Sequence, residues 1–320
     1  MKRAYLFAAL AALAMIVSRA EAAYPEHSVR VIVPYPPGGN IDITARTITP
    51  GLTEMLGVQV VVDNRGGAGG TIGSELAAKA TADGYTMLMG STGTLATAPL
   101  LYKIHFDPLK DYAYTSLVSR VPLVAVVNPA IPAKTIKEFI ALAQARPGRV
   151  TMGSAGAGTS NHLTGEYFQS VTGVKLVHVP YKGSGPALVD LMGGQIDVMF
   201  DQLSSSIGYV QGGKLRALAV TTTKRASAMP NIPTMDESGL KGFEASTTTG
   251  ILLPAATPRD IVMKVHGALV KVLQRPATKE SFTRIGADAL ESTPQEFEKL
   301  MRSETAKWTK VVREANIRME

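Results

Sequence analysis

The 320-residue sequence contains no cysteine. This absence excludes disulfide bonds, thiolate metal sites, a nucleophilic thiol and a lipid anchor on an N-terminal cysteine. Aromatic residues make up only 6% of the chain and charged residues 18%. The cationic residues are scattered rather than clustered, so the sequence lacks the basic face with which proteins bind nucleic acids. We therefore expect no nucleic-acid partner.

Catalytic signatures are absent as well. No Gly-x-Ser-x-Gly elbow and no Walker loop occurs. His162 falls in the first turn of a predicted helix, where a neutral, locally bonded imidazole is expected. An exported hydrolase therefore has no candidate triad or metal set, and we expect a protein that is no enzyme and holds no cofactor or metal. None of the five histidines pairs with another His or Glu at metal-ligand spacing: His27, His105, His162, His178 and His266.

The N-terminus has the pattern of a secretory leader. Lys2 and Arg3 precede an apolar run over Ala4–Val17, and the small residues of Ala20–Ala22 indicate cleavage after Ala22. The run is shorter than the about 20 residues that cross a bilayer, although a signal anchor is the alternative. We expect residues 1–22 to be removed and the mature protein to be periplasmic, without a lipid anchor.

The mature chain of 320 − 22 = 298 residues has the length of two domains. Its net charge is +5, because the leader holds Lys2, Arg3, Arg19 and Glu21 of a chain with net charge +7. This mild cationic bias favours anionic small ligands.

Short β-branched runs alternate with helical patterns along the mature chain, which predicts an α/β fold with parallel sheets. Pro50 and Gly51 fall inside the first helical pattern, where we expect a kink or break. Capping boxes open the helices at Thr135 and Thr293. The predicted strands are 29–33, 58–62, 85–89, 123–127, 150–153, 176–181, 196–200 and 215–221, and the other predicted helices include 42–56, 71–80 and 259–273.

The middle series of strands and helices is predicted to form its own lobe. The chain would cross near 120–125 and return near 243–251, and two crossings make a hinge that a ligand can close. Lobe 1 would hold residues 23–122 and 246–320, and lobe 2 residues 123–245. A single larger domain is the alternative.

Two glycine-rich loops occur in the first half of the chain. Residues 34–40 lead from a strand into a helix, where free amides favour an anion; a tight turn capped by Asp42 is the alternative. Residues 63–73 invite comparison with a dinucleotide-binding loop. The spacing fails, because glycine follows Gly67-x-Gly69 at positions 70 and 73 rather than 72. We expect this second loop to serve packing.

Two further loops, 153–161 and 181–186, also open helices. Each alone could be an ordinary capped turn, but helix N-termini from both lobes that converge on one cleft would hold a carboxylate. Asp197 is expected to bond locally. Asp201, at the end of the 196–200 strand, could face the cleft.

At these loops the sequence resembles the Bug-type, or TctC-like, substrate-binding proteins of tripartite tricarboxylate transporters. The resemblance covers essentially the whole mature chain, in the family's order. The matching segments are VRVIVPYPPGGNIDITAR (29–46), VVDNRGGAGGTIG (61–73), ADGYTMLMGSTGT (82–94), LLYKIHFDPLKDY (100–112), GSAGAGTSNHLTGEYF (153–168) and VPYKGSGPALVDLMGGQIDVMFD (179–201).

The resemblance implies a type II periplasmic-binding fold of two lobes and a small carboxylate ligand: a di- or tricarboxylate, an acidic amino acid or an aromatic acid. It implies two pincer loops, a distal anion pocket, a hydroxyl-bearing loop, and an acidic strand end at Asp201 that can meet a ligand amine. The first pincer carries Tyr35, Pro36, Gly38, Gly39, Asn40 and Asp42, and the second Tyr181, Lys182, Gly183 and Ser184. The distal pocket carries Gly156, Gly158, Thr159 and Ser160, and the hydroxyl-bearing loop Thr92 and Thr94.

The sequence departs from the family pattern at four positions. Tyr35 stands where Phe is usual, so its hydroxyl can touch water or ligand; Gly66 and Ala82 replace prolines, and Pro50 interrupts a helix that is normally continuous. The resemblance implies delivery of the ligand to membrane transporter subunits. Presentation to a membrane sensor kinase is the alternative, and a monomer is the default for this class.

Overall fold

The computed structural model describes residues 24–314 and 317, so the expected leader at residues 1–22 lies outside the described residues. No helix within the described ranges is long and apolar enough to cross a membrane. The strands are β1 (Val29–Val33), β2 (Val60–Asn64), β3 (Thr86–Ser91), β4 (Tyr112–Val127), β5 (Val150–Ser154), β6 (Leu176–Pro180), β7 (Val198–Gln202), β8 (Arg216–Val220), β9 (Ser246–Pro254) and β10 (Asp288–Ala289). The helices are α2 (Asn40–Leu56), α3 (Thr71–Ala78), α4 (Ala98–Leu101), α5 (Ile136–Ala145), α6 (Ser160–Thr172), α7 (Ser184–Met192), α8 (Leu203–Gln211), α9 (Arg259–Gln274), α10 (Pro276–Arg284) and α11 (Pro294–Glu314), with a 3-10 turn at Ala68–Gly70 and a π-helix at Gly93–Thr97.

The strands of the described chain join into one curled mixed sheet in the order β2-β1-β3-β9-β4-β7-β5-β6, with β8 and β10 added to β4. Neighbours within β2-β1-β3 and within β7-β5-β6 are parallel, as the alternation of strands and helices predicts. β9 and β4 run antiparallel to their neighbours in the middle of the sheet.

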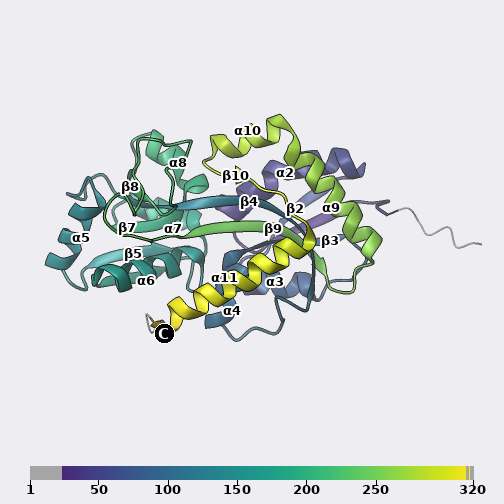
Figure 1. Cartoon of the computed structure of the whole chain (residues 1–320), viewed down its shortest axis with the longest axis horizontal. Coiled ribbons are helices and arrows are strands. Elements are labelled where there is room, and N and C mark those ends of the chain that lie inside the picture. Colours follow the sequence, from purple (N-terminus) through teal and green to yellow (C-terminus); the bar gives the residue numbers. More distant parts are fainter. Residues whose placement is uncertain (1–23, 315–316, 318–320) are drawn as a thin grey trace, which may run out of the picture.

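β4 joins the two halves of the molecule (Figure 1). Its first part, Tyr112–Pro122, pairs with β9, and its last part, Leu123–Val127, pairs with β7. The strands β1, β2, β3 and β9 thus form lobe 1 with the start of β4, whereas β5 to β8 form lobe 2 with its end. The change of partner within β4 falls between Pro122 and Leu123.

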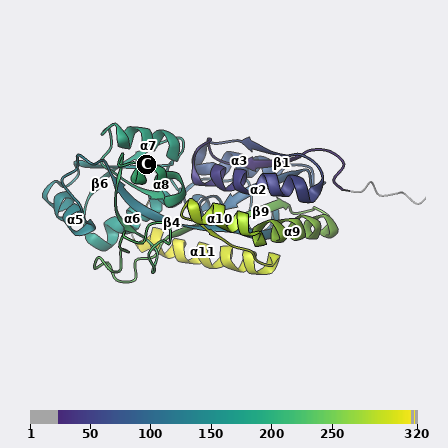
Figure 2. The same ribbon diagram turned by 90° about the horizontal axis from the view of Figure 1, so that it is seen from above.

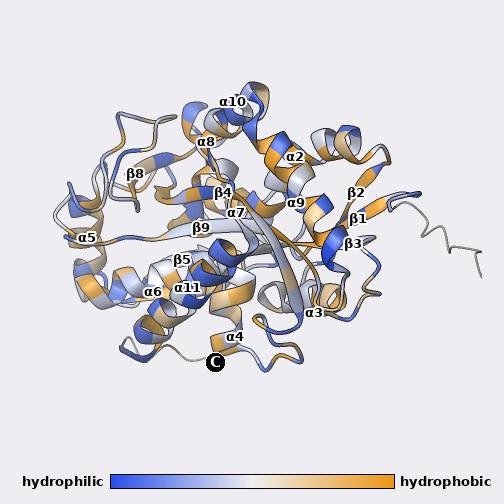
Figure 3. Cartoon of the chain, turned by 45° about the vertical axis from the view of Figure 1, so that its right-hand side comes forward, coloured by the Kyte–Doolittle hydropathy of each residue, from blue (hydrophilic) through white to orange (hydrophobic). Residues whose placement is uncertain are grey.

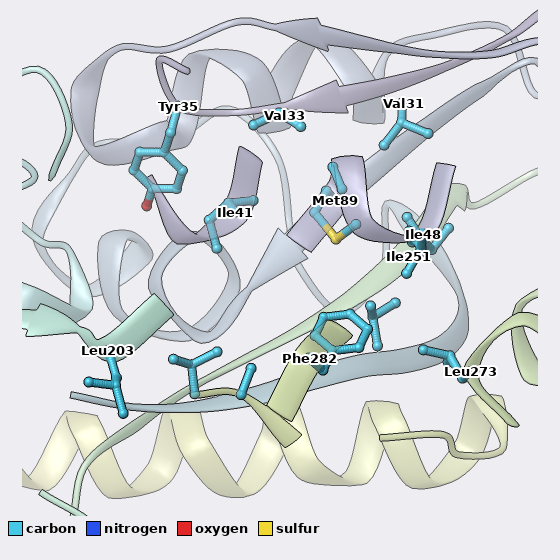
Figure 4. Packing of buried hydrophobic residues seen from close by; sticks show 14 of the residues in the cluster. Val31, Val33, Tyr35, Ile41, Ile48, Met89, Leu203, Ile251, Leu273 and Phe282 are labelled. Atoms are coloured by element: carbon cyan, nitrogen blue, oxygen red, sulfur yellow. The ribbon is translucent and has the colours of Figure 1, made fainter. Parts of the chain in front are cut away.

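The core follows the strands from one lobe into the other. In Figure 3 the strands β1 and β2 carry hydrophobic residues, whereas many outer turns of the helices are hydrophilic. Figure 4 shows one buried cluster to which β1, α2, β3, β9, α9 and α10 contribute Val31, Val33, Ile48, Met89, Ile251, Leu273 and Phe282. Leu203 of lobe 2 belongs to the same cluster. This cluster therefore packs residues of both lobes against one another.

The expected break at Pro50 is wrong. α2 runs as one helix from Asn40 to Leu56 with Pro50 inside it. Ile48 and Leu52, two residues before and two after Pro50 in the sequence, are fully buried, and this burial offsets the hydrogen bond that the proline cannot donate. Gly51 permits close contact with α9, because a Cβ there would lie 2.8 Å from Cγ1 of Val272.

The sequence prediction placed some strands differently from the structure. The strand expected at 58–62 begins at Val60, because α2 ends in a left-handed Gly57 (φ 74°) and β2 pairs Val60 with Val29. The strand expected at 196–200 is Val198–Gln202. β9 and the first eleven residues of β4 were not predicted, because both of their faces are mostly buried and no alternation marks them.

α11 crosses from one lobe to the other, as Figures 1 and 2 show from two directions. Its capping box is formed as predicted: Thr293 accepts from the amide of Glu296, and Glu296 accepts from the amide of Thr293. Phe297 packs in a lobe 1 cluster, whereas Trp308, 1% exposed, packs in the cluster that contains Phe139, Phe168 and Phe243. The last helix therefore ties both lobes together.

Candidate functional site

A cavity of about 380 Å³, counting its opening to solvent, lies where the loops of the two lobes meet. Residues of the three loops expected to bind an anion, 34–40, 153–161 and 181–186, line it together with residues that were not predicted. The lining consists of Tyr35, Pro36, Gly39, Asn40, Ile41, Ser91, Gly93, Ala155, Thr159, Ser160, Asn161, Ser184, Gln202 and Thr247.

Three helix N-termini meet at this cavity. Their N-cap residues are Gly39 for α2, Thr159 for α6 and Gly183 for α7. The first-turn amides of a helix have no partner within the helix, and the helix dipole adds positive potential there. α2 belongs to lobe 1 and α6 and α7 to lobe 2, so donors from both lobes can hold one anion.

Two buried side-chain atoms at the cavity have no hydrogen-bond partner among the described residues. These are Nδ2 of Asn40, a residue that is 3% exposed, and Oγ of Ser160, also 3% exposed. The other end of the Asn40 amide is held, because Oδ1 accepts from Oγ of Ser204 at 2.7 Å. A buried donor without a partner costs about 1–3 kcal/mol. Both groups are therefore suited to meet polar ligand atoms.

The first pincer loop is fixed from behind by Asp42. Its carboxylate accepts from the amide of Gly38 at 3.0 Å, from Nδ2 of Asn64 at 3.0 Å and from Nε of Arg46. Burial alone would raise the pKa of Asp42, but these three donors together hold its pKa below the usual value. Asp42 does not line the cavity and shapes the loop, where Gly38 takes a left-handed φ of 88°.

The distal loop, Gly153–Asn161, is built on Gly156 (φ 129°) and Gly158 (φ 73°). Thr159 caps α6 and also donates to the carbonyl of Gly156 at 2.7 Å. The amide of Gly158 donates to Nδ1 of His162 at 3.1 Å, which confirms the expected locally bonded imidazole. The loop is thereby held with the N-terminus of α6 toward the cavity.

The imidazole of His162 stacks on His178 with ring centres 4.0 Å apart. Nε2 of His178 lies 2.7 Å from Oγ of Ser154, which in turn accepts from the amide of Gly156. Burial lowers the pKa of His162 to about 3, with a contribution from His178, and burial lowers the pKa of His178 to about 4. Two neutral histidines thus support the distal loop.

Acidification is expected to destabilise the protein through this pair. The unfolded chain takes up protons below the ordinary histidine pKa of about 6.5, whereas the folded chain does so only near 3 to 4, so stability is lost as the pH falls through this window. At pH 5, one such histidine costs about 2 kcal/mol. The His178→Gln variant keeps an acceptor for Ser154. Urea unfolding should show that its free energy of unfolding falls less between pH 7 and pH 5 than that of the wild type.

Two carboxyl groups with raised pKa values act in the opposite direction to the histidines. Burial raises the pKa of Asp201 to about 6 and also raises that of Glu166, whose Oε1 lies 3.7 Å from Nε2 of His162. Because both carboxyl groups are present in His178→Gln and in the wild type, the difference between these two proteins gives the contribution of His178 to the pH dependence of stability. His105→Gln, at an exposed histidine, is the control. An equal pH dependence in His178→Gln and the wild type would show that the pair is not neutral in the folded protein.

The second pincer loop meets the first across the cleft. A Cβ on Gly183 (φ 135°) would lie 3.1 Å from Cδ of Pro36, and one on Gly39 would lie 3.9 Å from Cβ of Ser184. Lys182 is exposed, and the hydroxyl of Tyr181 donates to Asp190 at 2.7 Å. Of this loop, Ser184 lines the main cavity, whereas Tyr181 and Lys182 line an adjoining recess.

Asp201 lies fully buried behind the second pincer. Its Oδ1 accepts from Oγ of Ser184 at 2.8 Å and from Nδ2 of Asn161 at 3.0 Å, and its Oδ2 accepts from Oγ of Ser205 at 2.5 Å. It is not among the residues that line the cavity. The expected local bond of Asp197 is wrong: its carboxylate accepts from the amide and hydroxyl of Thr151, which lies 46 residues earlier in the sequence.

Thr92 and Thr94 hold the turn after β3 rather than line the cavity. Oγ1 of Thr94 accepts from the amide of Ser91 at 3.0 Å, and Oγ1 of Thr92 accepts from the amide of Thr248 at 3.2 Å. Their neighbours Ser91 and Gly93 form the wall instead. Of the lining that was not predicted, Asn161 and Gln202 directly follow predicted residues, whereas Thr247 carries no signal in the sequence.

A second recess adjoins the main cavity and shares Tyr35, Pro36 and Ala155 with it. Gly67–Gly70 form one side of it. The hydroxyl of Tyr35 donates to the carbonyl of Gly69 at 2.9 Å, and a Cβ on Gly69 would lie 2.8 Å from the carbonyl oxygen of Ala157 in lobe 2. The other residues of the recess are Tyr102, Gly156, Ala157, Pro180, Tyr181 and Lys182. The 63–73 loop packs as the sequence predicts.

Direct bonds between the lobes show that the cleft is closed. Oγ1 of Thr97 donates to the carbonyl of Gly158 at 2.7 Å, and the hydroxyl of Tyr102 donates to that of Ala157 at 3.1 Å. Two α/β lobes that are joined by crossing strands and close over a small polar cavity define a solute-binding protein.

A model of the tripartite tricarboxylate transporter family receptor matches residues 44–317, and the chain belongs to this family. BugT of Bordetella pertussis is 37% identical over 317 residues, which cover 98% of this chain and 97% of BugT. The structure of Rpa4515 of R. palustris with adipate has a TM-score of 0.90 and 34% identity, over 92% of this chain and 99% of that one. The structure of MatC of Rhodopseudomonas palustris with bound malate has a TM-score of 0.87 and 30% identity, over 90% of this chain and 100% of MatC.

These comparisons confirm the expected two-lobed periplasmic-binding fold and the resemblance to the TctC-like family. The family is described as a transporter receptor, and the similar structures include that of the periplasmic binding protein BugD, with a TM-score of 0.89 and 36% identity over 93% of this chain and 100% of that one. On that ground the expectation that the chain is not an enzyme is confirmed.

Proposed function

We propose that this protein captures a small carboxylate in the interlobe cavity and delivers it to the membrane subunits of a tripartite tricarboxylate transporter. The observation that carries the proposal is the convergence of three helix N-termini from both lobes on one cavity. The bound adipate and malate of similar proteins support a carboxylate as the ligand. Delivery to a transporter is supported by the family to which the chain belongs.

The binding energy would come from neutral donors. No ionised side chain of the described residues lines the main cavity. Hydrogen bonds to a charged group are worth about 1.5–3 kcal/mol each. Four or five of them support a dissociation constant on the order of micromolar after the cost of association.

We also propose how the chain is divided. Lobe 1 would comprise residues 23–122 and 246–320 and lobe 2 residues 123–245, with α11 packed on both. The site would consist of the two pincers and the distal loop, with Asp42, Thr92, Thr94 and Asp201 as residues that position it. Residues 1–22 would be removed on export to the periplasm, which mass spectrometry of the secreted protein tests.

A thermal-shift panel on residues 23–320 tests the ligand class. Succinate, malate, adipate and benzoate represent carboxylates, with putrescine and glucose as a matched amine and sugar. Carboxylates should raise the melting temperature by mass action on the folded state. A panel in which the amine or the sugar stabilises and no carboxylate does would overturn the proposal.

Asn40→Asp is expected to weaken binding of a stabilising acid at least about tenfold. The change replaces the unpaired Nδ2 with a carboxylate oxygen that repels the ligand, while Ser204 can still donate to Oδ1. Isothermal titration calorimetry measures the effect. Gln211→Glu, which adds the same charge to the exposed end of α8, is the control and should bind as the wild type does. Equal affinities of all three proteins would remove Asn40 from the site.

A further inference from the structure

Asp201 is the acidic group at this site through which a ligand ammonium could be bound, and its environment decides whether it can be reached. The side chain is 0% exposed. Ser184, which lines the cavity, directs its hydroxyl hydrogen to Oδ1 of Asp201, and Ser205 donates to Oδ2. Asn161, also in the lining, donates to Oδ1 as well. The carboxylate is thus enclosed by three neutral donors, two of which stand between it and the cavity.

The side-chain amide oxygens of the lining and the hydroxyl oxygen of Thr247 also accept hydrogen bonds. Oδ1 of Asn40 accepts from Ser204, and Oδ1 of Asn161 accepts from Nε2 of Gln202 at 3.3 Å. Oε1 of Gln202 accepts from Nδ2 of Asn161 at 3.2 Å, and Oγ1 of Thr247 accepts from Gln202 at 3.1 Å. Asn161, Gln202 and Thr247 thus form one chain of hydrogen bonds in the lining, and Asn40 and Ser204 form a separate pair. An ammonium group has three donors and no acceptor, so it would have to share oxygens that already accept a hydrogen bond.

The unpaired groups have the opposite character. Nδ2 of Asn40 can only donate, the hydroxyl of Ser160 can donate or accept, and the helix N-termini present amides. The cavity therefore offers new hydrogen bonds to carboxylate oxygens and few to an ammonium. An ammonium that is buried without acceptors loses its hydration without compensation.

From this asymmetry we propose that the protein selects carboxylic acids without an amino group and rejects the matching amino acids, with Ser184 as a specificity-determining residue that screens Asp201 from the ligand. This inference rests on the proposed function, because it assumes that a carboxylate occupies the cavity. The inference narrows the expected ligands from carboxylates in general to carboxylic acids that lack an amino group.

The test compares acids that differ by one amino group. Isothermal titration calorimetry at pH 7.5 measures succinate against L-aspartate, glutarate against L-glutamate and adipate against L-2-aminoadipate. In every pair that binds, the amino acid should bind on the order of 100-fold more weakly, as expected when a buried charged group lacks partners. An amino acid that binds within tenfold of its partner, or more tightly, overturns the inference and leaves the proposed function in place. If no carboxylate from the pairs or the wider panel binds, the proposed function fails as well.

A variant of Ser184 tests the cause of the selection. Ser184→Ala removes the hydroxyl in front of Asp201 and opens Oδ1 toward the cavity, so the ratio of the two dissociation constants in a pair should fall by about tenfold. Ser206→Ala is the matched control, since its hydroxyl donates to the backbone carbonyl of Gln202 and not to Asp201. A wild-type ratio in Ser184→Ala would show that Ser184 does not screen Asp201 and would overturn that part of the proposal.

Discussion

Gly39→Val is expected to abolish carboxylate binding, with a loss of at least about 100-fold in affinity, equivalent to about 2.7 kcal/mol. Gly39 caps α2 with a φ of −88°, which any residue can adopt. A Cβ there would already lie 3.9 Å from Cβ of Ser184 in the opposite lobe. The two methyl groups of valine would fill the remaining space between the pincers, cover the amides of α2 and hinder closure of the cleft.

Two companion variants separate this effect from a change in stability. Gly39→Ala adds only the Cβ in ordinary contact and should keep its affinity within about tenfold of the wild type. Gly208→Val places the same side chain on the exposed part of α8, where a Cβ meets nothing within 4 Å. Titration calorimetry measures affinity and thermal unfolding checks the fold. If Gly39→Val binds the acid as tightly as Gly39→Ala does, the first loop is not a pincer.

Trp308→Ala is expected to lower the free energy of unfolding by about 3–5 kcal/mol, the range for truncating a large buried aromatic side chain. Trp308 is 1% exposed and packs from α11 into the lobe 2 cluster. Its Nε1 also donates to Glu304 at 3.0 Å. The cavity left by the indole would loosen α11 from lobe 2, so this single side chain tests whether the last helix ties the lobes together.

Urea unfolding measures the effect, and Lys310→Ala on the exposed face of α11 serves as its control. The Lys310 ammonium lies 3.9 Å from Glu314, and its side chain is 74% exposed, so its loss should change stability by less than about 0.5 kcal/mol. Similar midpoints for Trp308→Ala and the wild type would mean that α11 contributes little to lobe 2.

The sequence predicted those parts of the fold that local signals determine. β1 was placed at its observed bounds, and the capping boxes at Thr135 and Thr293 open the helices as expected. β9 was missed because it is buried on both faces in the middle of the sheet, where no alternation of polar and apolar residues remains. Its place depends on pairing with β3 and β4, and such long-range pairing has no local signature.

The residues of the candidate site also fall into those that a local sequence pattern predicts and those that it does not. The glycine-rich loops around Gly39, Thr159 and Ser184 could be predicted because each joins a strand end to a helix start, which is a local pattern. Gln202 and Thr247 could not, because they meet only where lobe 2 returns to lobe 1. The sequence places Asp201 at a strand end, but the hydroxyls of α7 and α8 that enclose its carboxylate become visible only in the folded chain.

A crystal structure of the protein with the tightest-binding carboxylate tests the central claim most directly. We predict that the carboxylate oxygens lie about 3 Å from the first-turn amide nitrogens of α2 and of α6 or α7, directly or through one ordered water. Nδ2 of Asn40 should donate to the same ligand. A structure in which those amides bond to protein atoms, and the ligand lies outside the space between the loops, would contradict the account.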